Sequence, residues 1–146
     1  MSAEQAICFV DTNVLVYAFE KVGSTKKQTA QQLVTALMDT DRLRLSTQVL
    51  QELFVVLTRK AAARCTGDEA LGVLEDLAAW PVTLIDFPAI RDAASLSGRA
   101  RLSFWDSLVL VCAAKSGSSV LYTEDLNNGQ EILGVRVTNP FAGSTP

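Results

Sequence analysis

The sequence predicts an α/β fold with three layers, α/β/α, in which helices cover both faces of a mostly parallel central sheet. Short apolar runs typical of strands alternate along the chain with longer segments whose apolar residues recur at helical spacing. Parallel strands need long crossover connections, and these helical segments can supply them. At 146 residues the chain has the length of one ordinary domain. We therefore expect a single domain over 1–146, with a core of about 6–141 and a loose tail at 142–146.

The first strand and helix are predicted from an apolar run and the turn residues that follow it. Residues 7–10 are all apolar and are followed at once by Asp11, Thr12 and Asn13. Asp11 or Thr12 could cap a helix that begins near Asn13 and ends before Gly23. Ligands of open α/β sheets bind beyond the carboxyl ends of the strands, so Asp11 is also a candidate functional residue. At this point both interpretations of Asp11 remain open.

The next helix and strand follow from a cap and an alternating run. We expect Ser24 or Thr25 to open a helix whose apolar residues repeat on one face. Residues 42–45 alternate arginine with leucine, which is the period of a strand. Ser46 follows directly and is expected to cap another helix.

The helix expected from about 47 to 63 contains the second notable carboxylate. At about 100° per residue, Glu52 falls between apolar side chains rather than on a polar face. An unpaired buried carboxylate is unfavourable. Glu52 therefore needs either an arginine partner or a functional role with a bound cation.

Two further helices and a strand are predicted before the third candidate acid. Gly67-Asp68 should open a helix, which Pro81 stops. Residues 82–86 predict a strand, and residues 88–99 predict a helix that ends near Gly98.

Ser103 and Asp106 precede an apolar helix predicted at 108–114. Their spacing resembles a capping box, with Asp in place of the usual Glu or Gln. Capping alone could explain Asp106. A carboxylate in the first turn also gains from the positive end of the helix dipole, whichever role it has.

The last part of the chain repeats the arrangement seen at its start. Residues 119–123 predict a strand, and Asp125 lies just beyond its end, as Asp11 lies beyond the first strand. A loop around 127–129 and a short strand at 135–138 should complete the fold.

Composition limits the chemistry that is available. The chain has no histidine, which removes the commonest general base and every zinc site that contains His. Cys8, Cys65 and Cys112 lack metal-site spacing and are expected to be reduced structural thiols. The net charge of −3 means that a nucleic acid would have to be held by a local basic patch and bound cations. No run approaches the about 18 apolar residues of a membrane span, and no secretory signal opens the chain, so we expect a cytoplasmic protein.

Four acidic residues could meet at one edge of the sheet: Asp11, Glu52, Asp106 and Asp125. Two carboxylates about 5 Å apart repel by roughly 3 kcal/mol at an effective dielectric near 20, so such a cluster needs protons or a cation. Oxygen ligands without His or Cys favour Mg²⁺ or Mn²⁺. Such an ion activates water and stabilises charge on a phosphodiester, so the cluster predicts hydrolysis of a phosphate ester. Asp11, Asp106 and Asp125 would bind the metal, and Glu52 would bind it or orient the attacking water.

Four hydroxyl or amide residues near these acids are candidates for holding the carboxylates in place: Thr12, Asn13, Ser46 and Thr123. Each also has an ordinary interpretation as a cap or turn residue.

Four stretches of the chain resemble the PIN domain family: Val10-Asp11-Thr12-Asn13-Val14-Leu15, residues 46–52, Ser103-Phe104-Trp105-Asp106 and Tyr122-Thr123-Glu124-Asp125-Leu126. The resemblance covers about 7–141 and includes the closing residues 134–141. Within the family the chain is most similar to the VapC-type toxins of bacterial toxin–antitoxin pairs. This resemblance implies a PIN-like fold and an endoribonuclease that depends on Mg²⁺ or Mn²⁺. It also implies a homodimer and an antitoxin protein that inhibits it.

Carried over position by position, the family's metal-binding acids fall on Asp11, Glu52, Asp106 and Asp125, and its polar support falls on Asn13 and Thr123. Glu124 lies beside Asp125 and could substitute for it. Successive residues of an extended segment point to opposite sides, so only one of these two can easily face the cluster.

An RNA substrate needs cationic contacts despite the negative total charge. Arg99 and Arg101 are the preferred phosphate contacts, because they lie shortly before Asp106. The apolar surface of the second and third predicted helices could form the dimer face or receive an antitoxin segment. An antitoxin could inhibit by placing an arginine against the acid cluster.

Two other classes of function stay open. Asp11-Thr12-Asn13 loosely resembles the opening of haloacid-dehalogenase-type phosphatases, whose strand-end Asp is a nucleophile, but those enzymes need a second Asp where Asn13 stands. A phosphoenzyme trapped on Asp11 would favour that class. The other alternative is an interaction module that keeps the PIN fold without turnover.

Overall fold

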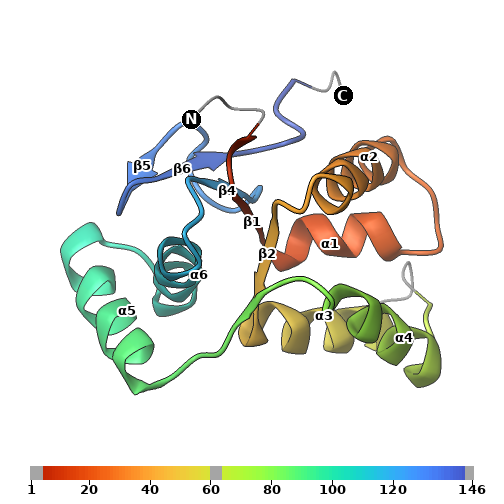
Figure 1. Ribbon diagram of the computed structural model, residues 1–146, viewed down its shortest axis with the longest axis horizontal. Coiled ribbons are helices and arrows are strands. Elements are labelled where there is room, and N and C mark those ends of the chain that lie inside the picture. Colours follow the sequence, from red (N-terminus) through yellow and green to blue (C-terminus); the bar gives the residue numbers. More distant parts are fainter. Residues whose placement is uncertain (1–4, 60–63, 144–146) are drawn as a thin grey trace.

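The computed structural model describes residues 5–59 and 64–143 (Figure 1). In this part of the chain six strands form one sheet in the order β3-β2-β1-β4-β6-β5. The strands are β1 (Cys8–Val10), β2 (Leu43–Ser46), β3 (Val82–Thr83), β4 (Val120–Tyr122), β5 (Glu131–Ile132) and β6 (Val135–Thr138). All neighbouring strands are parallel except β5 and β6, which are antiparallel. The prediction of a mostly parallel sheet is confirmed.

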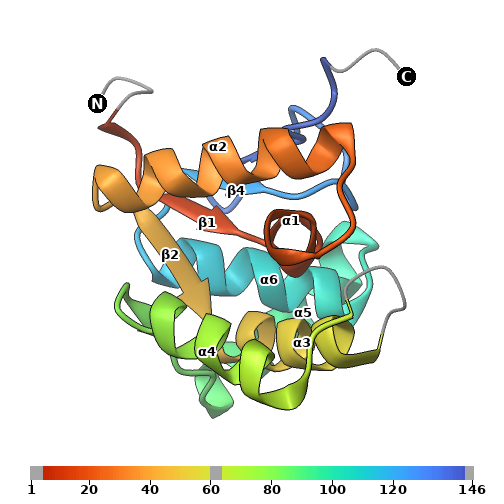
Figure 2. The ribbon, with the colours of Figure 1, turned by 90° about the vertical axis from the view of Figure 1, so that its right-hand side faces the viewer.

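Helices cover both faces of this sheet. They are α1 (Thr12–Phe19), α2 (Thr25–Asp39), α3 (Thr47–Arg59), α4 (Gly67–Leu77), α5 (Phe87–Ala100) and α6 (Phe104–Lys115). Figure 2 shows α2 on one side of β1 and β4 and α6 on the other. The α5 helix packs against α6, while α3 packs against both α1 and α4. The predicted three-layer α/β/α architecture is therefore confirmed. None of the described helices is both long and apolar enough to cross a membrane.

The central elements are those with the most continuous apolar sequence. Cys8, Phe9 and Val10 of β1 are fully buried, as expected for a parallel strand that is covered on both faces. The α6 helix is buried from Ser107 to Ala113, so it has no polar face in that stretch. Burial raises the pKa of the Cys112 thiol to about 11, which suits an unreactive structural thiol.

Side-chain caps begin the helices where the sequence predicts them. The hydroxyl oxygen of Ser24 accepts a hydrogen bond from the Lys27 amide at 3.2 Å, and that of Ser46 accepts one from the Val49 amide at 3.3 Å. A capping box of Thr66 and Glu69 begins α4 and was not predicted.

Two predicted boundaries differ from the structure, and a third is not tested by it. Gly98 does not end α5, which continues to Ala100 and closes at Arg101 in the left-handed region, with φ 56°. The strand predicted at 82–86 is limited to β3, because the Asp86 side chain accepts a hydrogen bond from the Ala89 amide and begins α5. The α3 helix is described to Arg59, and the rest of the helix predicted to 63 lies outside the described residues.

The sequence analysis also missed β5. It pairs with β6 through a two-residue turn in which Leu133 and Gly134 both have positive φ, 56° and 75°. Such turns usually contain Asn-Gly or Asp-Gly, so Leu-Gly gives a weak signal. Residues 142 and 143 of the predicted tail are exposed, and 144–146 lie outside the described residues.

Candidate active site

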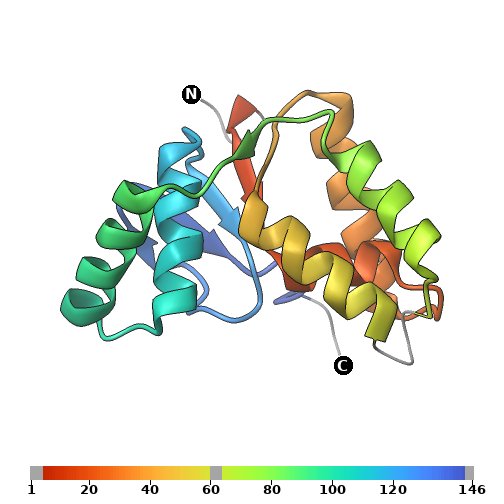
Figure 3. The same ribbon diagram turned by 90° about the horizontal axis from the view of Figure 1, so that it is seen from below.

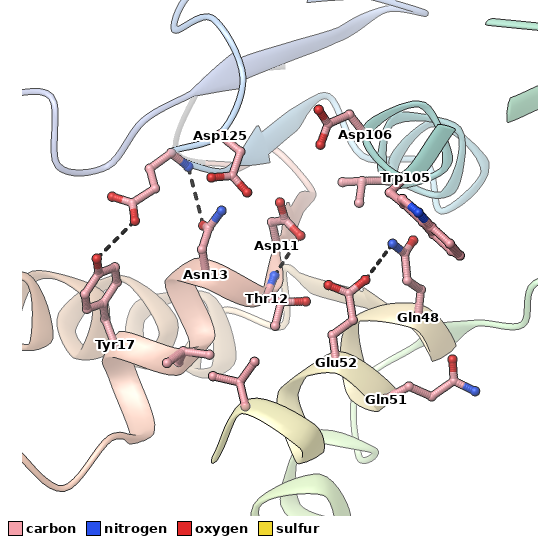
Figure 4. Close-up of a pocket in the computed structure, with 14 residues that line it drawn as sticks. Asp11, Thr12, Asn13, Tyr17, Gln48, Gln51, Glu52, Trp105, Asp106 and Asp125 are labelled. Carbon is pink, nitrogen blue, oxygen red and sulfur yellow. Dashed lines mark hydrogen bonds between the residues drawn. The ribbon is translucent and has the colours of Figure 1, made fainter. Parts of the chain in front are cut away.

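A cleft of about 690 Å³ opens where β1 and β4 end, and all four candidate acids line it. Asp11 follows β1, Asp125 lies beyond β4, Asp106 lies in the first turn of α6, and Glu52 lies in α3. Figure 3 shows α3 and α6 on opposite sides of the strand ends. The two helices thus bring their acids to the cleft from two directions, and the four carboxylates face one open space (Figure 4). The assignment of catalytic roles to them remains a prediction.

Asp11 is the most buried of these acids, with 8% of its surface exposed. Its Oδ1 accepts a hydrogen bond from the Thr12 amide at 2.8 Å, so the capping interpretation of Asp11 is correct. Its Oδ2 accepts a hydrogen bond from the Thr123 hydroxyl at 2.9 Å. Capping and a place in the cleft are therefore compatible.

Burial raises the pKa of the Asp11 carboxyl to about 6. The hydrogen bonds from Thr123 and Thr12 act in the opposite direction, because they stabilise the ionised form. The negative charges of Asp125 and Glu52 raise this pKa further. Asp11 thus lies within the electrostatic field of two of the other acids, which is a setting that favours a bound cation.

The Thr123 hydroxyl connects three segments of the site. It donates to Asp11 Oδ2 and accepts hydrogen bonds from Asn13 Nδ2 and the Asp125 amide, both at 3.2 Å. Thr123 is fully buried. Its three hydrogen bonds fix the start of α1 relative to the turn that carries Asp125.

Asn13 uses both ends of its amide. While Nδ2 donates to Thr123, Oδ1 accepts a hydrogen bond from the Glu124 amide at 3.4 Å (Figure 4). An ionised aspartate here could not donate to Thr123, because it has no N–H group. The residue is thus suited to positioning β4 and its following turn rather than to acid chemistry.

Glu124 and Asp125 have different surroundings. The Glu124 carboxylate accepts hydrogen bonds from Lys26 Nζ at 2.9 Å and from the Tyr17 hydroxyl at 3.1 Å. The Lys26 ammonium also lies over the rings of Tyr17 and Phe141, 5.1 and 5.3 Å from their centroids. For the Asp125 carboxylate, the described residues provide no hydrogen bond or ion pair. Glu124 is neutralised by Lys26, and Asp125 is the one that is available to a cation.

Glu52 is held by a neighbour on its own helix. Gln48, one turn earlier in α3, donates from Nε2 to Glu52 Oε1 at 2.7 Å. Gln48 is only 5% exposed, and its Oε1 has no hydrogen-bond partner among the described residues. Glu52 is exposed, so the expectation that it is buried among apolar side chains and needs an arginine partner is wrong. No such partner is found within the described ranges, where the ion-paired acids are Glu69, Asp92 and Glu124.

Asp106 makes only one of the two hydrogen bonds of the expected capping box. Its backbone amide donates to the Ser103 hydroxyl oxygen at 3.0 Å, which confirms Ser103 as the cap. The described part of the chain shows no reciprocal bond from the Asp106 side chain, and this carboxylate lines the cleft. Capping therefore uses the backbone of Asp106 and leaves its carboxylate available.

Some candidate residues do not reach the cleft. Ser46 is fully buried and caps α3. Arg99 lines a separate groove of about 200 Å³ beside α6, and Arg101 forms the carboxyl cap of α5. Thr12 does line the cleft, and its hydroxyl donates to the Val49 carbonyl at 3.5 Å.

The cleft also contains polar and aromatic residues that the sequence analysis did not single out: Tyr17, Gln48, Gln51 and Trp105. Two of them had a local signal. Gln48 lies four residues before Glu52, which places both on one helix face. Trp105 directly precedes Asp106 at a helix start, where an aromatic residue has no capping role.

The lining of the cleft suits a hard cation chemically. Its oxygen ligands are carboxylates, side-chain amides and the hydroxyls of Thr12 and Tyr17, and its described lining includes no lysine or arginine. Such oxygen ligands are those of Mg²⁺ and Mn²⁺. In the described chain, however, no three acidic, cysteine or histidine side chains are gathered closely enough to form a metal site by themselves. A cation here would need water ligands or side-chain movement in addition.

Comparison with known protein families finds one family that matches most of the chain. The family model of the PIN domain matches residues 8–128. A search of curated proteins found no match.

Several solved structures share the fold. A toxin–antitoxin complex from Klebsiella pneumoniae contains a chain with TM-score 0.68 and 18% identity, covering 91% of this chain and 97% of that one. VapC20 of Mycobacterium tuberculosis, described as a sarcin–ricin loop cleaving toxin, has TM-score 0.64 and 20% identity, covering 81% and 89%. DNA-bound VapBC from Salmonella typhimurium has TM-score 0.63 and 20% identity, covering 92% and 98%. At these identities the similarity concerns the fold.

Proposed function

The chain belongs to the PIN domain family, and from this premise we propose that it is a metal-dependent endoribonuclease, the toxin of a type II toxin–antitoxin pair. One observation carries the proposal. Asp11, Glu52, Asp106 and Asp125, from four separate segments, line a single cleft whose described lining has no cationic side chain. Carboxylates are rarely grouped in this way without a function, because like charges raise the free energy of the folded state.

In this proposal Asp11, Asp106 and Asp125 hold Mg²⁺ or Mn²⁺, directly or through water, and Glu52 holds the ion or orients the attacking water. When bound, such an ion supplies an activated water and offsets the charge that develops on a phosphodiester.

The chain's other residues position these acids. The Thr12 amide and the Thr123 hydroxyl fix both oxygens of Asp11, and the Gln48 amide fixes one oxygen of Glu52. Asn13 holds the strand end that leads to Asp125 through Thr123. These contacts reduce the reorganisation that metal binding requires.

The structural relatives support the choice of substrate and partner. VapC20 is described as cleaving the sarcin–ricin loop, and the Klebsiella structure is a toxin–antitoxin complex. For this chain we propose an RNA substrate, a cognate antitoxin and a homodimer. The exposed Phe54 and Val55 of α3, 36% and 49% accessible, support a protein contact on that helix. No large apolar side chain of α2, all of whose residues lie in the described ranges, is exposed, so the proposed contact is restricted to α3.

The proposal is tested by measuring cleavage of RNA in Mg²⁺ or Mn²⁺ by the wild type and by Asp106→Asn. We expect cleavage to fall by at least about 100-fold, since even outer-shell partners of metal ligands are worth 10–100-fold. Circular dichroism should show that the variant is folded, because the Asp106 carboxylate makes no hydrogen bond or ion pair with any other described residue.

Two adjacent acids provide a matched control. Asp125→Asn should lose cleavage, whereas Glu124→Gln should stay close to the wild type, because Glu124 is paired with Lys26. Near-normal cleavage by Asp106→Asn would remove that residue from the site. Cleavage that persists in excess chelator would contradict metal dependence. A folded wild type that cleaves no RNA with either ion would instead favour an interaction module.

A further inference from the structure

Trp105 is exposed in a way that the fold does not require. Its side chain is 63% accessible, although tryptophan is usually among the more buried residues. It lies in the first turn of α6, whose buried stretch begins only at Ser107. It also lines the acid cleft, directly beside Asp106 in the sequence. Neither the core nor the helix cap accounts for an indole ring at this place.

The ring of Trp105 is nevertheless restrained. The Phe104 ring meets it edge to face, with centroids 5.2 Å apart and planes at 82°. Phe104 is itself half-buried against the hydrophobic core. The indole is therefore a large apolar surface that is held at the edge of the cleft and still open to solvent, which lowers the entropy lost when a ligand covers it.

The charge of the cleft makes such a surface useful. The lining carries four candidate acids and Glu124, and no lysine or arginine belongs to its described part. The phosphates of a nucleic acid are repelled by carboxylates, and most nucleic-acid binding otherwise depends on Lys and Arg. Neither Arg99 nor Arg101 lines this cleft. Apart from bound cations, attraction near the acids must come from contacts that do not depend on charge.

We propose that Trp105 is the stacking surface for one unpaired base of the RNA substrate, next to the phosphate that is cleaved. The inference rests on the proposed nuclease function and specifies its substrate: an unpaired segment or loop rather than a continuous duplex. Bases within a duplex have both faces covered by their neighbours, so only a splayed base can stack on a protein ring. Stacking tolerates any base, because every base has a π-face.

Polar groups for the base edge lie on the same side of the cleft. Figure 4 shows Gln48 and Gln51 below Trp105, whereas Asn13 and Asp125 lie on the opposite side. The buried Gln48 Oε1 has no partner among the residues that the structure describes. Side-chain amides both donate and accept hydrogen bonds, as the edges of bases do.

The test compares Trp105→Ala and Trp105→Phe with a matched control, Phe87→Ala. Phe87 is also an exposed aromatic residue at a helix start, 69% accessible, but it does not line the cleft. On a short single-stranded RNA we expect Trp105→Ala to raise KM roughly 10-fold, as expected for the loss of one stacked base, with a smaller change in kcat. Trp105→Phe should restore most of the loss, and Phe87→Ala should match the wild type.

Binding is measured separately from cleavage in an Asp106→Asn background. There Trp105→Ala should weaken the Kd for the same RNA by a similar factor, roughly 10-fold. The Asp106→Asn protein with Trp105 intact should bind the fully paired form of this RNA more weakly than the single strand. Trp105→Ala should leave binding to the paired form unchanged.

The outcomes separate the two proposals. If the wild type cleaves RNA but Trp105→Ala has unchanged KM and Kd, the stacking role is wrong and the nuclease function stands. Equal loss of RNA binding by Phe87→Ala would also overturn it, as would a defect of Trp105→Ala confined to kcat or to association with a protein partner. If the wild type neither binds nor cleaves RNA, the proposed function fails and the stacking role falls with it.

Discussion

Asp11 combines two requirements that oppose each other. It must be ionised to hold a cation, yet it is buried and shares a cleft with the three other candidate acids and Glu124. The Thr12 amide and the Thr123 hydroxyl stabilise its charge, but they do not fully offset burial, and its pKa is raised to about 6. In the absence of metal, the ionised residue therefore opposes folding at neutral pH.

We expect Asp11→Asn to be more stable than the wild type at pH 7 without divalent ions. The folded pKa of about 6 lies above the ordinary value of 3.8 for an aspartate, so the protonated carboxyl favours folding fully below about pH 4. This contribution is lost as the pH rises through about 6. At about 1.36 kcal/mol per pKa unit the loss approaches 3 kcal/mol. Asparagine avoids it but gives up one acceptor oxygen, so the net gain should be roughly 1–2 kcal/mol.

Urea unfolding in chelator at pH 4.5 and pH 7 measures this effect. The advantage of the variant should shrink or vanish at pH 4.5, where the wild-type carboxyl is largely protonated in the folded state. Glu75→Gln, at an exposed position of α4, should show no such pH-dependent gain. An Asp11→Asn protein that is less stable than the wild type at pH 7 would contradict the explanation.

The sequence predicts single residues best where their role depends on local structure. Each of the four acids follows a strand end or lies near a helix start, so strand and helix patterns were sufficient to select them. The link between Asn13 and Thr123 joins residues far apart in the chain and needs the tertiary structure. Closeness in sequence does not place a residue in the site. Arg99 and Arg101 are both near Asp106 along the chain, but neither lines the cleft.

At the scale of elements, helix starts place two of the acids. Asp11 caps α1, and Asp106 lies in the first turn of α6 with Ser103 as the cap. Carboxylates are stabilised at these positions by the positive end of the helix dipole. A cap therefore supports both the helix and the position of the acid.

Ser103→Ala is expected to lower both stability and activity, because the Ser103 hydroxyl oxygen accepts the amide hydrogen of Asp106. Loss of a serine cap costs about 1 kcal/mol of unfolding free energy. Thr66→Ala removes the side-chain cap of α4, none of whose residues lines the cleft, and should cost a similar amount. Denaturant unfolding and RNA cleavage of both variants provide the comparison. The idea fails if kcat falls equally in both.

Helices and strands were predicted well where the apolar pattern was long. They were predicted less well where turn residues determined the boundary of the element. The α6 helix and β1 follow from continuous apolar runs, and β2 follows from the alternation of arginine with leucine. Glycine often ends a helix, but it is tolerated within one, so α5 continues through Gly98 and Arg101 closes it instead. The Leu133-Gly134 turn was missed because leucine is an unusual residue at positive φ.

At the scale of the whole molecule, the strand order creates the cleft. Residues adjacent to the ends of β1 and β4 meet because these two strands pair in parallel, Val10 opposite Tyr122. The α3 and α6 helices then add Glu52 and Asp106 from two sides (Figure 3). Strand and helix alternation predicts the layers, but it does not give this strand order, which depends on long-range pairing.

Divalent ions should stabilise the whole fold if they bind the cleft only when it is formed. After treatment with chelator, Mg²⁺ or Mn²⁺ at about 100 times its Kd should add about 2.7 kcal/mol. For a chain of this size that raises Tm by roughly 5–10 °C. Thermal unfolding monitored by circular dichroism measures the shift.

The size of this shift should depend on the cleft. Asp106→Asn should reduce it, whereas Glu124→Gln should retain it because Glu124 is paired with Lys26. If saturating metal leaves the Tm of the wild type unchanged, or shifts Asp106→Asn equally, the ion does not bind where we place it.

Lys26 lies over the rings of Tyr17 and Phe141, and this contact connects the segment after β6 to the acid cleft. Phe141 packs edge to face on Tyr17, with centroids 5.2 Å apart, and both rings flank the ammonium that restrains Glu124. A truncation that removed Phe141 would remove one of the two aromatic rings that contact the Lys26 ammonium. The two groups that bind Glu124, Lys26 and Tyr17, would each lose a neighbour, so the position of this charge beside Asp125 depends in part on a residue near the end of the described chain.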